Sequence, residues 1–141
     1  MKREALLISQ IKKVLTPDLL KPEFRASYIE TNPMAGHCYA ASEALYHLLG
    51  GSNSGYTPCR GKDDLGVTHW WLQNKGGEIL DPTAEQYLSV GRTPPYKNGK
   101  GGGFLTKLPS KRAREIIRRV SSNNNIKSID TAKILQKSNG R

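Results

Sequence analysis

The sequence contains a cysteine, a histidine and an aspartate that together could perform nucleophilic chemistry on a carbonyl group. Cys38 stands in "NPMAGHCYAASEALYHLLGG", directly after a Gly-His pair and at the start of an apolar, helix-forming run. A thiol attacks as the thiolate, and the dipole at a helix N-terminus favours that form. A cysteine used only for packing would more usually lie among the leucines in the middle of the helix. We therefore interpret Cys38 as a candidate nucleophile.

A nucleophilic thiol also needs a base, and His69 is the histidine best placed to supply one. Adjacent residues on a helix do not face each other, so His37 cannot easily reach Cys38. His47 lies about two and a half helical turns further on and faces the opposite side. His69 belongs instead to "GVTHWWLQNKGGEILDPTAEQ", in which two β-rich runs flank a Gly-rich turn.

The turn of this predicted hairpin decides which residue lies beside His69. Side chains alternate between the two faces of a strand. An odd-length loop centred on Lys75 would put Asp81 directly opposite His69, with the Cβ atoms about 5 Å apart. A two- or four-residue loop would put Trp70 opposite Asp81 instead. The pair Gly76-Gly77 suits the left-handed position that a three-residue loop needs, so the odd-length loop is favoured.

The pattern therefore permits a triad in which Cys38 is the nucleophile, His69 the base and Asp81 the orienting carboxylate. Asp63 and Asp64 are the alternative orienting residues. Each member alone has an ordinary structural reading: a packed thiol, a half-buried histidine beside tryptophans, and an aspartate that starts a turn before proline. Their joint arrangement favours the triad.

Three short motifs resemble the papain-like fold and, within it, the transglutaminase-like branch. "HWWL…GGEILDPT" is similar to that branch's His-x-Trp…Asp-Pro-Thr strand pair, and "CYAAS" is similar to the Cys-aromatic-Ala-x-Ser helix start of papain. The resemblance covers roughly residues 30–86 and keeps the chain order Cys, His, Asp. The whole chain also resembles small phage-encoded proteins. The resemblance implies an α+β fold in which the nucleophile helix packs on a small antiparallel sheet. The basic C-terminal helix and tail of this sequence belong to neither family and are expected as an addition to that fold.

The same resemblance implies a cysteine-dependent hydrolase or acyl transferase, that is, a protease, an amidase or a transglutaminase-like enzyme. It would act on an amide, ester or thioester carbonyl of a peptide, a protein or a small acyl substrate, without a cofactor. Asn32 occupies the oxyanion-hole position six residues before the cysteine, where papain has glutamine. Tyr39, Trp70 and Trp71 are expected to wall the substrate cleft.

Zinc binding is the competing chemistry for these side chains. Cys59 and the histidines at positions 37 and 69 could join Cys38 as ligands, but no CxxC or HxxxH spacing accompanies them. "TPCRG" lacks the second cysteine of a deaminase P-C-x-x-C motif. We therefore expect no metal site.

The Gly-rich run "GKGGG", residues 99–103, is not a phosphate-binding loop. It lacks the Gly-Lys-Ser/Thr ending of a P-loop and is expected to be a flexible lid or strand connector.

The net charge of +10 is concentrated in the last 45 residues. Residues 97–141 contain twelve Lys or Arg and two acids, whereas residues 1–96 contain ten of each. Such a basic region is either a solvated surface or a contact for a polyanion, and we expect it to lie outside the catalytic core. The alternative function is therefore a non-catalytic basic module that binds nucleic acid or an acidic protein through Lys111, Arg112, Arg118 and Arg119.

The elements that must position these side chains follow from hydrophobic spacing and turn residues. Helices are predicted over 3–15, 38–49 and 111–120, the last starting after Pro109-Ser110. Strands are predicted over 67–73 and 78–83, and loops over 52–66, with a short strand near Tyr56, and over 90–104. One domain is expected over 1–120, followed by a mobile basic tail over 121–141. With no signal peptide and no run of 18 apolar residues, we expect a cytoplasmic protein with reduced cysteines and no membrane contact.

Overall fold

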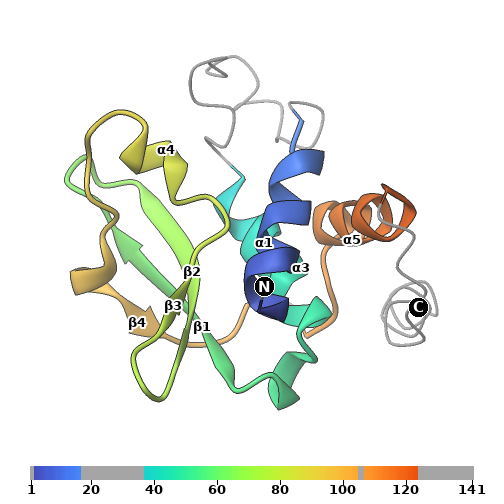
Figure 1. Cartoon of the computed structure of the whole chain (residues 1–141). Coiled ribbons are helices and arrows are strands. Elements are labelled where there is room, and N and C mark those ends of the chain that lie inside the picture. The colour runs from blue at the N-terminus through green and yellow to red at the C-terminus, as the bar shows by residue number, and fades with distance from the viewer. Residues whose placement is uncertain (1, 17–36, 105–106, 124–141) are drawn as a thin grey trace.

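A computed structural model describes residues 2–16, 37–104 and 107–123, which form a mixed α+β fold. The described residues contain four α-helices: α1 (Arg3–Val14), α3 (Cys38–Leu48), α4 (Glu85–Leu88) and α5 (Lys111–Asn123). They also contain the 3-10 turns η2 (Gly51–Asn53) and η3 (Tyr96–Asn98). One antiparallel sheet runs in the order β3-β2-β1-β4, with β1 (Tyr56–Lys62), β2 (Thr68–Asn74), β3 (Ile79–Leu80) and β4 (Lys100–Gly101). The three longer helices gather on one side of the molecule, and the sheet and α4 lie on the other (Figure 1).

The stretch over 52–66, predicted as a loop with a short strand near Tyr56, contains β1, which starts at Tyr56 and is one of the two central strands of the sheet. β1 pairs with β2 over its whole length and with β4 at two positions. The strand was predicted too short, because Pro58 and Gly61 are typical breakers of a strand. Gly61 is needed in the strand, since a Cβ there would stand 3.0 Å from the carbonyl oxygen of Pro95. The chain segment that crosses β1 therefore packs directly on its backbone.

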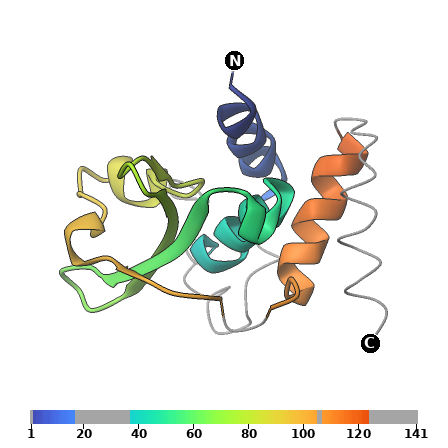
Figure 2. The same cartoon turned by 90° about the horizontal axis from the view of Figure 1, so that it is seen from below.

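The hydrophobic core lies between the helices and the sheet. It is built from the apolar sides of α1, α3 and α5 and from Leu72 and Leu80 of the sheet. α3 runs through the middle of the molecule, between the sheet and α5 (Figure 2). The side chains of α5 that enter the core are completely buried: Ala113, Ile116, Ile117 and Val120. The expectation that the basic region lies outside the core is therefore wrong for α5, because its apolar side completes that core.

A buried carboxylate on α3 fixes the start of α5. Glu43 is completely buried and accepts hydrogen bonds from the backbone N–H of Ser110 at 3.1 Å and from its hydroxyl at 2.6 Å. The Ser110 hydroxyl oxygen in turn accepts a hydrogen bond from the N–H of Ala113 at 3.3 Å, which confirms the predicted helix cap. Burial raises the pKa of Glu43, while the Ser110 hydrogen bonds and the charge of Arg112 oppose that rise.

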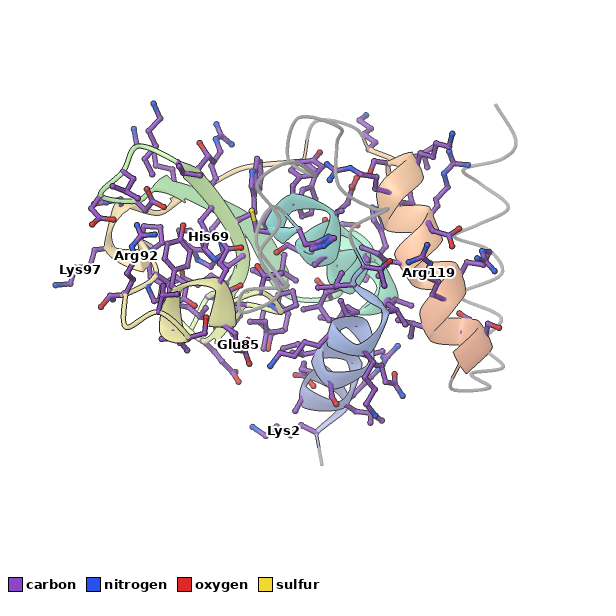
Figure 3. All side chains as sticks on the ribbon, turned by 90° about the horizontal axis from the view of Figure 1, so that it is seen from above. Lys2, His69, Glu85, Arg92, Lys97 and Arg119 are labelled. Atoms are coloured by element: carbon purple, nitrogen blue, oxygen red, sulfur yellow. The ribbon has the colours of Figure 1, made fainter. Side chains whose placement is uncertain are left out.

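Two of the arginines proposed for polyanion contact are engaged within the fold. Arg118 and Arg119 both pair with Glu115, and their hydrogen bonds lower the pKa of that carboxyl to about 2. Arg119 also donates to the carbonyl of Val14 at 3.2 Å and to the hydroxyl of Thr16 at 2.7 Å, which ties α5 to the end of α1. The side chains of Arg119 and His69 lie on opposite sides of the molecule (Figure 3).

Helix α5 ends at residue 123, three residues beyond its predicted end. The rest of the predicted tail, 124–141, lies outside the described residues, and so does Asn32. Among the helices that the structure describes, none has the length and apolar character needed to cross a bilayer.

Candidate active site

Helix α3 is aligned along an edge of β2 that β3 leaves open. β3 pairs only with Leu72 and the residue after it. Nearer the start of β2, the Ser42 hydroxyl donates to the carbonyl of Trp70 at 3.2 Å, and Cys38 Sγ lies 3.9 Å from the carbonyl oxygen of Thr68. Four helix residues rise about 6 Å and two strand residues about 6.6 Å, so the two contacts match in spacing. This match places Cys38 beside the start of β2, where His69 lies.

The hairpin that carries His69 and Asp81 has the predicted loop length in a different register. Leu72 pairs with Leu80, and the N–H of Gly77 donates to the carbonyl of Asn74 at 3.0 Å with Gly77 at a φ of 85°. The three-residue loop is therefore centred on residue 76 rather than 75. The predicted direct opposition of His69 and Asp81 was wrong, because the continued register puts residue 71 opposite Asp81. The shift keeps both side chains on one face, as diagonal neighbours.

The predicted contact between His69 and Asp81 is present. His69 Nε2 and Asp81 Oδ2 are 2.6 Å apart, and the side chains are 0% and 3% exposed. The same carboxylate oxygen accepts a hydrogen bond from the Tyr96 hydroxyl at 2.7 Å. The other oxygen accepts from the N–H of Thr83 at 3.1 Å and from its hydroxyl at 3.4 Å. Both carboxylate oxygens are thus fixed, and Asp81 holds the imidazole in one orientation.

The other side of the His69 ring is the side available to Cys38. Among the described residues, no nitrogen or oxygen atom makes a hydrogen bond to His69 Nδ1, so the Cys38 thiol has no competitor for it. Burial lowers the pKa of His69, but hydrogen bonding to Asp81 and to the Cys38 thiol, together with their charges, more than offsets burial and raises that pKa from 6.5 to about 9. An imidazole held in this way remains protonated at neutral pH beside the thiol.

The two tryptophans after His69 play different parts. Trp71 is completely buried and stacks against the His69 ring at 5.8 Å, so it packs against the histidine inside the fold. Trp70 points to the opposite face, as strand alternation requires, and contacts Tyr39 edge-on at 4.9 Å and Phe104 by stacking at 5.5 Å. Of the three residues predicted to wall a cleft, the structure therefore brings together Tyr39 and Trp70.

Tyr96 is a site residue that the sequence reasoning assigned to a loop. The segment expected as a flexible lid or connector contains η3 and β4, and it packs closely on Trp71. A Cβ at Gly99 would stand 2.4 Å from the Trp71 ring, so only glycine fits there. This close approach brings the Tyr96 ring edge-on to Trp71 at 5.1 Å and its hydroxyl to Asp81. In the sequence, Tyr96 is marked only as an aromatic residue within a Pro/Gly-rich run, which does not indicate a contact with Asp81.

The remaining candidates have other partners. Asp63 accepts a hydrogen bond from the Tyr87 hydroxyl at 2.8 Å, and Asp64 pairs with Arg92, so neither alternative carboxylate orients His69. Cys59 is buried in β1 with its Sγ 3.6 Å from the carbonyl oxygen of Thr57, and burial raises the pKa of its thiol. Within the ranges that the structure describes, no group of three or more His, Cys, Asp or Glu side chains is arranged to hold a metal ion.

Comparison of the chain with protein-family models, with curated proteins and with solved structures finds no match. The function is therefore inferred from the side-chain geometry.

Proposed function

We propose that this protein is a cysteine-dependent hydrolase or acyl transferase with a Cys38–His69–Asp81 triad on a papain-like core. One observation carries the proposal. A buried imidazole is bound at one nitrogen by a carboxylate at 2.6 Å, and its other nitrogen is left to a thiol at the first residue of a helix. The chain order Cys, His, Asp and the packing of the nucleophile helix on an antiparallel sheet support the transglutaminase-like branch.

In the proposed reaction His69 already carries the proton that Cys38 has given up, so the resting pair is a thiolate and an imidazolium. The thiolate attacks the carbonyl carbon of an amide, ester or thioester, and the C=O electron pair moves onto oxygen. The backbone N–H of Cys38, in the first turn of α3, and the Asn32 side chain would hold that oxyanion. The electron pair then returns, the leaving group takes the proton from His69, and a thioester on Cys38 remains. Water or an amine attacks this thioester, gives its proton to His69, and the thiolate is restored.

The proposal is tested by labelling the two cysteines competitively at pH 6 with limiting iodoacetamide and reading each site by mass spectrometry. We expect Cys38 to carry most of the label, because it faces an imidazolium, whereas burial keeps the Cys59 thiol protonated. Cys59→Ser should leave this labelling unchanged, and Cys38→Ala should abolish any acyl-transfer activity without unfolding the chain. Equal labelling of the two sites, or predominant labelling of Cys59, would contradict the proposed function.

Tyr96 is a positioning residue in this proposal, because it reaches the reacting atoms only through Asp81. Tyr96→Phe keeps the ring against Trp71 and removes one hydrogen bond of about 1–2 kcal/mol to the carboxylate. We expect the rate of Cys38 alkylation at pH 6 to fall by about three- to tenfold.

Tyr56→Phe is the matched control, since the Tyr56 hydroxyl also donates to a carboxylate, that of Glu4 at 3.4 Å, but lies at the end of β1 far from His69. Only Tyr96→Phe should slow the alkylation beyond about twofold. Equal rates in the two variants would show that the Tyr96 hydroxyl has no role in orienting the triad.

A further inference from the structure

All the lysine and arginine side chains of the sheet point to one of its two faces. The four strands that the structure describes contain Arg60, Lys62 and Lys100, and they contain no Asp or Glu. Arg60 lies directly opposite Lys100, and Lys62 is two residues further along β1. Directly opposed residues, and residues two apart on one strand, point to the same face. We call these three residues the cationic face.

The cationic face is opposite to the face that carries the proposed catalytic histidine. His69 pairs with Gly61, and Gly61 stands between Arg60 and Lys62 in β1. Because side chains alternate along a strand, His69 points away from the three cations. A ligand of the cationic face is therefore separate from the substrate of Cys38.

The fold leaves the positive charge of the cationic face without compensation. Its three side chains are exposed, and none takes part in an ion pair within the described ranges of the chain. The acids that follow Lys62 in the chain, Asp63 and Asp64, both pair with Arg92 instead. Like charges that lie directly opposite each other on neighbouring strands destabilise a sheet. A negatively charged ligand would relieve this repulsion.

The three cations are close enough to act on one anionic chain. Directly opposed Cβ atoms are about 5 Å apart, and residues two apart on a strand are about 6.6 Å apart. The Debye length is about 10 Å at 0.1 M salt, so the fields of the three charges overlap at ordinary ionic strength. The cationic face therefore favours a ligand with several neighbouring negative charges over a small anion with one.

Arg60 is held over a cluster of aromatic rings. Its guanidinium carbon lies 5.6 Å from the centre of the Trp70 ring, and a Cβ at Gly102 would stand 3.3 Å from Arg60 Nη1. Trp70 stacks on the half-buried Phe104 at 5.5 Å, and the half-buried Tyr39 meets both rings edge-on. A guanidinium held on a ring keeps its forked donors oriented, and such donors match a phosphate group. Nucleobases stack on guanidinium planes and on aromatic rings of this kind.

We propose that the cationic face binds single-stranded nucleic acid through its phosphate backbone. Proteins that bind single strands without sequence preference combine a row of basic side chains with aromatic rings, and this face has both. An acidic peptide would supply the charge but not the flat bases that the Arg60–Trp70 stack can accommodate. The contact lies on the sheet rather than on α5, where Arg118 and Arg119 are paired with Glu115. This inference goes beyond the proposed function and does not depend on it.

The experiment measures the binding of fluorescent oligo(dT) and oligo(U) of equal length to the full chain by anisotropy, over a series of salt concentrations. DNA and RNA share the phosphate backbone, so the tighter of the two strands identifies the ligand. We expect the triple variant Arg60→Gln, Lys62→Gln, Lys100→Gln to bind this strand about 10- to 100-fold more weakly at low salt. Each phosphate contact contributes about 0.7 to the slope of log K against log salt for a single strand, so that slope should fall by about two.

A second triple variant, Lys2→Gln, Lys13→Gln, Lys75→Gln, is the matched control. It removes the same net charge from exposed positions outside the cationic face. Its affinity for the strand should fall by less than about threefold, because charges separated by more than a Debye length are largely screened. The urea midpoint of each variant confirms that it is folded.

The comparison also states what would overturn the inference. Equal losses in the two triple variants would show that only net charge matters, and an unchanged slope in the first variant would remove its three cations from the contact. Binding of polyglutamate as tight as that of the oligonucleotides would overturn the choice of nucleic acid. These measurements do not involve the thiol, so failure of Cys38 to react faster than Cys59 with iodoacetamide would bear only on the proposed function.

Discussion

Replacing His69 with glutamine is expected to lower the rate at which iodoacetamide alkylates Cys38 at pH 6 by about tenfold to 100-fold. An ordinary thiol, with a pKa of about 8.5, is about 0.3% thiolate at this pH, whereas a thiol paired with an imidazolium is mostly thiolate. The lower nucleophilicity of a stabilised thiolate offsets part of that gain. In the wild type the rate should change little between pH 6 and 8, while in His69→Gln it should rise about tenfold per pH unit.

His47→Gln is the matched control for this experiment. Burial lowers the pKa of His47, and its Nε2 has no hydrogen-bond partner among the described residues. It lies on α3 nine residues after Cys38 and faces away from the thiol. A wild-type pH profile for Cys38 in His69→Gln, or the same loss in both variants, would remove His69 from the mechanism.

Because the pKa of His69 is raised, the difference in folding stability between the wild type and His69→Gln is expected to depend on pH. A histidine whose pKa rises from 6.5 to about 9 on folding stabilises the folded state fully below 6.5 and loses that contribution as the pH rises through 9. The difference corresponds to on the order of 3 kcal/mol. Urea unfolding should therefore show a larger stability difference between wild type and His69→Gln at pH 6 than at pH 9.5. A difference that grows with pH would contradict the protonated state assigned to His69.

Replacing Ile117 with alanine is expected to lower the free energy of unfolding by about 2–4 kcal/mol, even though Ile117 lies in the most basic part of the chain. Its side chain is completely buried against the core, and a large-to-small change there loses transfer free energy and leaves a cavity. Arg118→Ala, at the next position, should cost far less because the side chain is exposed. The measurement is the urea midpoint of each full-length variant.

A loss below about 0.5 kcal/mol for Ile117→Ala would show that α5 is peripheral to the fold. The expected result instead assigns α5 two roles, with Ile117 and its apolar neighbours in the core and the arginines at the surface. The positive charge of this region then says little about its function. Arg118 and Arg119 both form ion pairs with Glu115, and Arg119 also donates a hydrogen bond to the carbonyl of Val14 at the end of α1.

The helices and the hairpin were predictable because local patterns decide them. The apolar spacing of α1, α3 and α5 gave their positions to within a few residues, and Pro109-Ser110 marked the start of α5. Only the start of β1 near Tyr56 was predictable, since proline and glycine within a strand are tolerated only when the neighbouring chain leaves room for them. For Gly61 that room is set by the carbonyl of Pro95, which is 34 residues away in the sequence.

In the candidate site, too, the features set by neighbouring residues were predictable and those set by residues distant in the sequence were not. Side-chain alternation was enough to put His69 and Asp81 on one face, but the register depended on which residue of the Gly-rich loop takes the left-handed conformation. Gly77 takes it, and the pairing moved accordingly. The contact of Tyr96 with Asp81 could not be read from spacing, because it depends on how closely Gly99 approaches Trp71.

The position of α3 along β2 also bears on how the protein avoids templated aggregation. An open strand edge offers unpaired carbonyls and N–H groups to which another chain can add. Here β3 and β4 are two residues long, and side chains of Ser42 and Cys38 lie against the outward carbonyls of β2. A second copy, or a peptide substrate, therefore cannot join the sheet at this edge without displacing the helix that bears the thiol. The proposed substrate must approach through its side chains and its carbonyl group, since strand addition beside Cys38 is blocked.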